Sequence, residues 1–211
     1  MITVRDQDAA LFREVKAGRK QAHREAQQLR RARRRCELAE TPPLPRGPFQ
    51  LLYADPPWAS DNLNVSWAPE NHYPTLELAE IKALAVPASE QALLLLWAVN
   101  CQLPQALEVM AAWGFEYKGN FAWVKPSPGV GQRIRNQHEL LLLGVRGSFP
   151  CPAPADVPLS LIEAPRGRHS EKPECVYELI ERMYPGCSKL ELFARGQPRP
   201  GWSAWGNEVE Q

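Results

Sequence analysis

The sequence predicts an α/β protein built on a largely parallel, doubly wound sheet of about seven strands. The first observation behind this prediction is that short apolar runs alternate with helix-like segments throughout residues 49–211. The second is that several runs, such as "ALLLLWA" (92–98) and "ELLLLGV" (139–145), are continuously apolar, which is typical of strands covered on both faces. With 211 residues, 44% of them hydrophobic, the chain can bury one substantial core.

The apolar runs give the expected order of elements. In chain order, strands are expected at residues 49–54, 92–98, 117–125, 139–145, 160–164, 189–194 and 202–206. Helices are expected at residues 76–84, 104–113 and 172–184. Thr75 is the expected N-cap of the first helix, Pro104 lies in the first turn of the second, and Gly114 follows its end. The third helix stops before Pro185 and Gly186.

Three segments are expected to stay irregular. Residues 58–74, 126–137 and 147–158 are polar or rich in Gly and Pro. Loops of this length in a compact α/β domain are usually functional. Trp97, Trp113 and Trp123 lie within or beside the predicted elements and are expected in the core.

The N-terminal segment differs in composition from the rest. Residues 1–40 carry 11 Lys or Arg and 6 Asp or Glu, a net charge of +5, whereas residues 41–211 have a net charge of −4. Residues 9–39 are predicted as one helix, and the proline-rich residues 41–48 as a linker to a domain over 49–211. The basic run consists of Arg30, Arg31, Arg33, Arg34 and Arg35.

These arginines favour contact with a polyanion, with a solvated helix face as the alternative interpretation. The five Cys follow no metal-binding or disulfide spacing, so no metal site is expected and the compartment is expected to be reducing. No apolar stretch reaches the roughly 18 residues of a membrane helix, and the N-terminus lacks a signal peptide's apolar core, so a cytoplasmic protein is expected.

The most informative stretch is "QLLYADPPWASD" (50–61), where an apolar strand runs into an acid, two prolines and an indole. Ligands of open α/β sheets bind beyond the carboxyl ends of the strands, which is where Asp55 falls. Pro56 and Pro57 stiffen the chain and are expected to leave carbonyl oxygens without a competing N–H donor. Two acceptors beside the flat face of Trp58 suit a planar group that carries an amine. The alternative is a proline turn with a buried Trp.

"ADPPW" resembles the signature of methyltransferases that use S-adenosylmethionine to methylate amino groups. Further blocks, among them "HYPTL", "RNQHELLLLGVRG", "HSEKPECVYELIERMYPG", "KLELFAR" and "GWSAWGNE", resemble the family of the catalytic subunit of eukaryotic mRNA adenosine methyltransferase. They span residues 49 to 208, and the likeness is greatest to short phage and prophage members. The resemblance implies a Rossmann-like class I methyltransferase fold with a permuted motif order, in which the catalytic motif precedes the cofactor strand.

The resemblance also implies roles for particular residues. The catalytic set would be Asp55, Pro56, Pro57, Trp58 and Tyr73, with Asp55 and the Pro56 carbonyl accepting the two N–H bonds of the adenine amine. The S-adenosylmethionine site would comprise Asp55, Lys172, Glu191, Phe193, Arg195, Asn207 and Glu208. The target base would meet Trp58, Tyr73, Asn136, His138 and Glu139.

The implied reaction is methylation of adenine N6 in nucleic acid. An enzyme that acts on a base takes it unpaired or flips it from the stack. DNA is the expected polymer, from the likeness to phage and prophage proteins, and RNA is the alternative. A catalytically silent nucleic-acid-binding subunit and an enzyme for a small-molecule or protein amine are further alternatives, and a homodimer or a partner subunit is possible. Because silent relatives lose the acid of the motif, the intact Asp55 speaks against the silent subunit.

Overall fold

The computed structural model describes residue 18 and residues 42–58, 76–129, 133–167 and 171–209. The chain divides into two compact units, residues 1–41 and 42–211, and only the second is described here. The predicted helix over 9–39 and its arginines lie outside the described residues, Gly18 apart. The boundaries predicted for arm, linker and domain therefore stay predictions.

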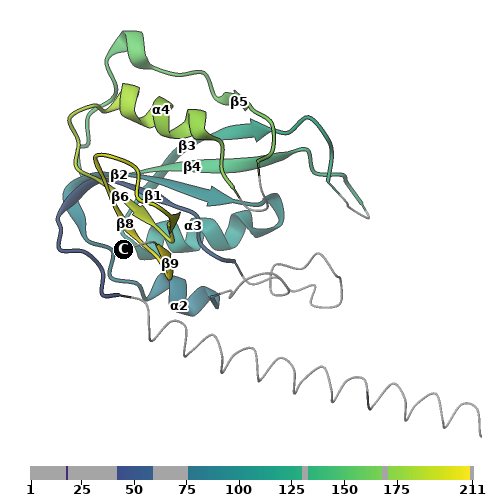
Figure 1. Cartoon of the computed structure of the whole chain (residues 1–211), viewed down its shortest axis with the longest axis horizontal. Coiled ribbons are helices and arrows are strands. Elements are labelled where there is room, and N and C mark those ends of the chain that lie inside the picture. Colours follow the sequence, from purple (N-terminus) through teal and green to yellow (C-terminus); the bar gives the residue numbers. More distant parts are fainter. Residues whose placement is uncertain (1–17, 19–41, 59–75, 130–132, 168–170, 210–211) are drawn as a thin grey trace, which may run out of the picture. The chain divides into compact units, whose positions relative to one another are not determined.

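The second unit is built on a seven-stranded sheet, which confirms the predicted α/β class (Figure 1). Its strands stand in the order β5-β3-β4-β2-β1-β6-β8. They are β1 (Phe49–Ala54), β2 (Ala88–Ala98), β3 (Glu116–Val124), β4 (His138–Arg146), β5 (Leu161–Glu163), β6 (Lys189–Leu192) and β8 (Trp202–Trp205). Two further strands, β7 (Arg195–Gly196) and β9 (Glu208–Val209), pair with each other. Each of the seven predicted strands corresponds to a strand of the sheet.

The direction of the strands determines which residues meet at one edge. β1 runs parallel to β2 and to β6, and β6 runs parallel to β8. β4 is antiparallel to both of its neighbours, β2 and β3. The start of β4 therefore lies at the same edge as the carboxyl ends of β1, β2, β3 and β6. The sheet is mixed and mostly parallel, as predicted.

Helices cover both faces of the sheet (Figure 1). On one face, α4 (Glu174–Met183) buries Val176, Ile180 and Met183 in a cluster with apolar side chains of β1 and β2. On the other face lie α2 (Leu78–Lys82) and α3 (Leu103–Ala112). The short 3-10 helix η2 (Asn100–Gln102) directly precedes α3. Close packing of α3 is seen at Gly144 of β4, where an added Cβ atom would lie 2.8 Å from the sulfur of Met110.

The core contains the tryptophans that the sequence places there. Trp97, Trp113 and Trp123 are 1%, 2% and 3% exposed, which confirms the prediction. Each indole N–H has a buried or partly buried acceptor; that of Trp97 donates to the Tyr53 hydroxyl oxygen at 2.7 Å. Trp97 and Trp123 also meet edge to face, with ring centroids 5.9 Å apart. Trp97 also contacts the motif that follows β1, because its carbonyl accepts from the indole N–H of Trp58.

The helix ends match the sequence signals with one exception. α3 carries Pro104 in its first turn and ends before Gly114, whose φ of +78° suits glycine. α2 begins at Leu78, two residues later than predicted, and Glu77 caps it through a reciprocal capping box with Glu80. Glu77 therefore takes the place predicted for Thr75, which lies outside the described residues.

The cofactor strand ends earlier than predicted. β6 stops at Leu192 because Phe193 adopts a left-handed backbone with φ of +62°. The chain then turns, and Ala194 donates its N–H to the carbonyl of Trp205 at 2.9 Å. Among the described residues, no helix is long and apolar enough to span a membrane, and no cluster of three or more His, Cys, Asp or Glu is placed to hold a metal ion.

Candidate active site

Four chain segments bring charged side chains to one edge of the sheet. Asp55 follows β1, Lys125 follows β3, and Glu139 is the second residue of β4. Lys172 reaches the same place from the segment that precedes α4. Because β4 runs against its neighbours, its first residues are placed beside the ends of the strands that run the other way. The candidate site is thus assembled by the sheet topology.

The motif after β1 forms a tight, hydrogen-bonded turn. The Asp55 N–H points to the Leu192 carbonyl of β6, 3.5 Å away. The Pro57 carbonyl accepts from the N–H of Leu76 at 2.8 Å, and Trp58 forms a bridge with that residue. The indole N–H of Trp58 donates to the carbonyl of Trp97 at 3.2 Å, and the side chain is 8% exposed. Trp58 therefore packs into the turn; its predicted stacking on a base stays a prediction.

One detail of the predicted motif is wrong. The Pro56 carbonyl does have a competing donor, since the N–H of Trp58 bonds to it at 2.8 Å. The reason is geometric: only Pro56 and Pro57 lack an N–H, and the chain folds back so that the next residue supplies one. A carbonyl oxygen has two lone pairs, so one acceptor position on Pro56 remains for an amine.

The charged side chains form a continuous cluster of alternating sign. Lys172 Nζ lies 2.9 Å from Asp55 Oδ2 and 3.5 Å from Glu139 Oε2. Lys125 bonds to the other oxygen of Glu139. The side chains of both lysines are also placed over aromatic rings, Lys172 5.3 Å from the ring centroid of Trp97 and Lys125 4.4 Å from that of Trp123. The cluster is mostly buried, with only 12% of the side-chain surface of each lysine exposed.

This environment lowers the pKa values of Glu139 and Lys125. Burial favours the neutral form of Glu139, yet the charges of Lys172 and Lys125 outweigh it and hold the pKa of Glu139 below its usual value. Burial lowers the pKa of Lys125, and Glu139 opposes that effect only in part. Glu139 therefore stays ionised as the counter-ion of both lysines.

The predicted cofactor strand presents a second carboxylate. Glu191 lies beside Tyr53 in the register of β6 with β1, close to Asp55. Its Oε1 accepts a 2.8 Å hydrogen bond from the hydroxyl of Tyr177 on α4. Burial raises the pKa of Glu191, the Tyr177 bond opposes the rise, and the charge of Asp55 adds to it.

The remaining predicted cofactor residues cluster around the chain's C-terminal segment. Phe193 meets Trp205 edge to face, with centroids 5.5 Å apart. Arg195 lies 3.6 Å from the carboxylate of Glu208, across the β7–β9 pair. Asn207 is exposed in the turn between β8 and β9. Phe193 and Arg195 follow Glu191 in the chain, and β8, which leads to Asn207 and Glu208, pairs with β6. The structure therefore brings these predicted cofactor residues together next to β6.

The predicted base-contacting residues are only partly accounted for. Glu139 belongs to the charged cluster, whereas His138 begins β4 as an exposed side chain. The side-chain oxygen of Asn136 accepts a 3.2 Å bond from the amide of Asn100. Tyr73 and the arginines of the basic arm, Arg30, Arg31, Arg33, Arg34 and Arg35, lie outside the described residues. Their predicted roles remain predictions.

Sequence reasoning missed three residues of this region. Lys125 and Asn100 each stand just past the end of an apolar strand, the same signal that identified Asp55, but neither belongs to a distinctive motif. Tyr177 sits in the middle of a helix, and no local pattern indicates that its hydroxyl reaches a strand. Only the packing of α4 on β6 shows that contact.

The site combines the edge of a mostly parallel sheet, a rigid Asp-Pro-Pro-Trp turn and the neighbouring carboxylate of Glu191. This combination defines a class of protein, the Rossmann-like methyltransferases that act on amino nitrogens. The chain matches the MT-A70 family over residues 49–208 and belongs to it. This confirms the family resemblance and, with it, the prediction of an adenine-N6 methyltransferase.

Curated relatives fall into a short and a long group. The type II methyltransferase M.MunI of Mycoplasma sp is 34% identical over 189 residues, which cover 80% of this chain and 81% of that protein. The human N(6)-adenosine-methyltransferase catalytic subunit METTL3 is 29% identical over 174 residues, 78% of this chain but 29% of that protein. An MT-A70-like N(6)-adenosine-methyltransferase of Drosophila melanogaster is 29% identical over 185 residues, again 29% of its length.

Proposed function

We propose that this protein transfers the methyl group of S-adenosylmethionine to the exocyclic amine of adenine in DNA. The observation that carries the proposal is the Asp55 carboxylate at the end of the central strand β1, fixed in the Asp-Pro-Pro-Trp turn and paired with Lys172. Family membership supports the reaction class. The residue roles are inferred from the family resemblance and the chemistry of the site, and the polymer from the relatives and the basic N-terminal segment.

Asp55 and the Pro56 carbonyl would accept the two N–H bonds of the amine. An adenine amine is a poor nucleophile because its lone pair is delocalised into the ring. Two acceptors in fixed positions favour a pyramidal nitrogen and direct its lone pair at the methyl group. Lys172 occupies Oδ2 of Asp55, which leaves Oδ1 for the amine. After transfer, the nitrogen carries a positive charge that the carboxylate stabilises until a proton leaves.

Lys172 also contacts a second carboxylate, that of Glu139, and this contact suits the transfer step. Glu139 Oε2 lies 3.5 Å from its ammonium group, so Lys172 bridges two carboxylates. As positive charge develops on the amine, Lys172 can shift toward Glu139 without losing a counter-ion. The charges of Lys172 and Lys125 together lower the pKa of Glu139 and keep it ionised.

The residues around β6 fit the proposed cofactor. S-adenosylmethionine supplies an electrophilic methyl group, and its ribose hydroxyls and ammonium group are donors that a carboxylate recognises. Glu191 offers such a carboxylate next to Asp55, and Arg195 offers a cation for the methionine carboxylate. Phe193 and Trp205 provide apolar surface for the adenine ring.

DNA is the polymer we propose. The match covers 81% of the type II methyltransferase M.MunI at 34% identity, but 29% of METTL3 at 29% identity. The arginines at 30–35 would contact phosphates, which gives binding that is sensitive to salt. Choice of target would then fall to the loops at the catalytic edge.

A transfer assay tests the proposal. The protein is incubated with labelled S-adenosylmethionine and, separately, with duplex DNA, single-stranded DNA and RNA, and the digested products are separated. Label in N6-methyladenine from a DNA substrate is the expected result. Label only in RNA would support the alternative of an RNA adenine-N6 methyltransferase. Label in cytosine, or in none of the polymers, contradicts the proposal.

The variant Asp55→Ala separates catalysis from binding. It removes the acceptor while leaving the β1 core intact, so transfer is expected to fall at least about a thousandfold, the scale of an electrostatic catalytic group. Cofactor affinity should fall far less than transfer, and the thermal midpoint should change little because Lys172 keeps Glu139 as a partner. A protein that acts as a silent binding subunit would show no transfer to lose, and its affinity for DNA would be the same with and without the substitution.

A further inference from the structure

The hydroxyl of Tyr177 makes a contact that the proposed reaction does not itself require. It donates to Glu191 Oε1 at 2.8 Å, from the helix α4 to the strand β6. Within the described part of the chain, this is the one hydrogen bond made by the Glu191 side chain. The carboxylate is therefore oriented by a residue that comes from the other layer of the fold.

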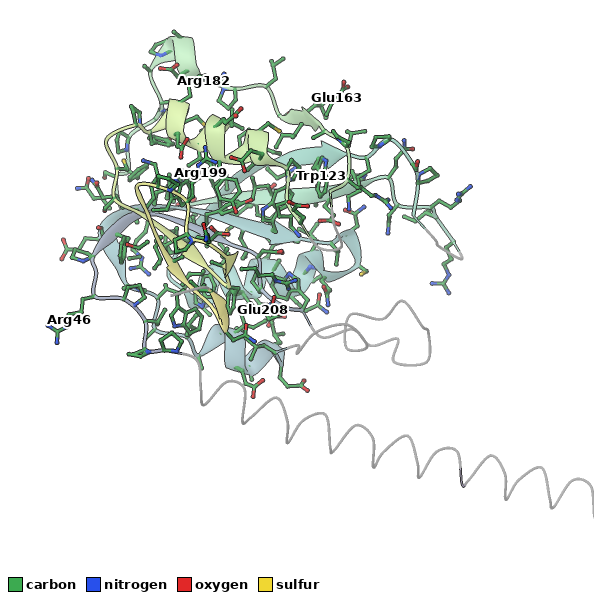
Figure 2. All side chains as sticks on the ribbon, in the orientation of Figure 1. Arg46, Trp123, Glu163, Arg182, Arg199 and Glu208 are labelled. Carbon is green, nitrogen blue, oxygen red and sulfur yellow. The ribbon has the colours of Figure 1, made fainter. Side chains whose placement is uncertain are left out.

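Tyr177 is itself held from several sides. Its ring meets Tyr53 and Trp202 edge to face, with centroids 5.0 and 5.5 Å away. The guanidinium of Arg199, which is labelled in Figure 2, lies 5.3 Å from the same ring. Arg199 is in turn bonded to Glu181 of α4. Such packing leaves the tyrosine few rotamers, so its hydroxyl is a fixed donor.

Glu191 needs such a donor because its surroundings oppose its charge. The groups that face it are Asp55 at the end of β1, itself paired with Lys172, and the hydroxyls of Tyr53 and Tyr177. Burial and the charge of Asp55 both raise the pKa of Glu191, and the bond from Tyr177 opposes them. A carboxylate that becomes protonated loses much of its ability to accept from ribose hydroxyls or an ammonium group.

We infer that Tyr177 is a positioning residue for the cofactor, holding Glu191 in the orientation in which it accepts hydrogen bonds from S-adenosylmethionine. This inference rests on the proposed function, because it takes Glu191 as a cofactor contact. It adds Tyr177, which lies outside the sheet edge and affects the cofactor only through Glu191.

The variant Tyr177→Phe tests this role, since it removes the hydroxyl and keeps the ring. Affinity for S-adenosylmethionine, measured by calorimetry on the full chain, is expected to fall about tenfold at neutral pH, the effect of losing one hydrogen bond to a charged group. The pKa of Glu191 should also rise further when its donor is gone. The pH below which cofactor affinity declines is therefore expected to move upward in the variant.

Tyr184→Phe provides a matched control. Tyr184 follows α4, packs against Phe149 and donates to the Pro150 carbonyl at 3.2 Å. It undergoes the same chemical change away from Glu191, so its cofactor affinity and pH dependence should equal those of the parent protein. A fall in thermal midpoint without a shift in the pH dependence of Tyr177→Phe would show a merely structural role and overturn the inference.

A double-variant comparison completes the test. In Glu191→Gln the titrating carboxylate is absent, so adding Tyr177→Phe should cost little further affinity. Independent, additive losses would contradict the inference. If the parent protein itself fails to bind S-adenosylmethionine, the proposed function fails instead, so the two failures are distinguishable.

Discussion

Individual side chains at the catalytic edge divide into those that a motif reveals and those that only the fold reveals. Asp55, Pro56 and Trp58 stand in a contiguous stretch whose residue types already indicate an amine acceptor. Lys172, named from the family resemblance as a cofactor residue, contacts Asp55 at 2.9 Å, a pairing that the sequence did not predict. Lys125 was not predicted, because a lysine after a strand is common and its partner Glu139 is 14 residues away in sequence.

At this scale, two partly buried carboxylates, Glu139 and Glu191, predict opposite pH effects on stability. The pKa of Glu139 is lowered in the folded chain, so its contribution to the free energy of unfolding is present above the unfolded pKa and is lost as pH falls through the folded one. The pKa of Glu191 is raised, so its charge costs stability as pH rises above the unfolded value.

Glu139→Gln and Glu191→Gln therefore form a matched pair for denaturant unfolding between about pH 3 and 7. Glu139→Gln is expected to flatten the loss of stability toward acid pH. Glu191→Gln is expected to remove the loss of stability that the ionisation of Glu191 causes as pH rises toward neutral. Equal slopes for the two variants and the parent chain would show that neither carboxylate titrates differently in the folded and unfolded states.

Whole elements were predicted better than their ends. Continuous apolar runs locate strands because burial on both faces requires them, and Pro104 with Gly114 delimits α3 because their backbone preferences are local. The direction of β4 could not be predicted, since an apolar run has the same composition in either direction. The early end of β6 could not be predicted either, because Phe193 adopts a positive φ that phenylalanine rarely takes.

The turn after β8 requires glycine at position 206, because the turn has no room for a Cβ atom there. A Cβ atom at Gly206 would lie 2.2 Å from the carbonyl oxygen of Ala194, which is backbone and cannot swing aside. Gly206→Ala is expected to push apart the segments that carry Phe193 and Asn207, lowering stability by about 1–3 kcal/mol as overpacking does. Weaker cofactor binding should accompany the lower thermal midpoint.

Gly119→Ala is the control for that substitution. Gly119 lies in β3, and an added Cβ there meets nothing within 4 Å. Its thermal midpoint and cofactor affinity should stay close to those of the parent chain. A comparable loss in both variants would show that the close approach at Gly206 has no particular importance.

The whole chain is charged unevenly, and that asymmetry carries a prediction of its own. Residues 1–40 hold a net charge of +5, against −4 for the remainder. Removing residues 1–40 is expected to weaken DNA binding and to reduce the slope of log affinity against log salt concentration, because fewer counterions are released. Fluorescence anisotropy at several salt concentrations measures both quantities.

A full-length variant without the arginine charges provides the control. Replacing the arginines at 30–35 with glutamine keeps the chain length and removes only the charge. It should reproduce the reduced salt slope of the truncation. An unchanged slope in both proteins would assign the segment to something other than phosphate contact.

The reversed direction of β4 has a consequence for how such an enzyme can diversify. Because β3 leads into the catalytic edge and β4 leads out of it, the connection between them begins and ends there. We expect that insertions after Lys125 would lengthen a segment at this edge without altering the register of any strand. Relatives could then differ in the length of this connection while they keep the bond between Lys125 and Glu139.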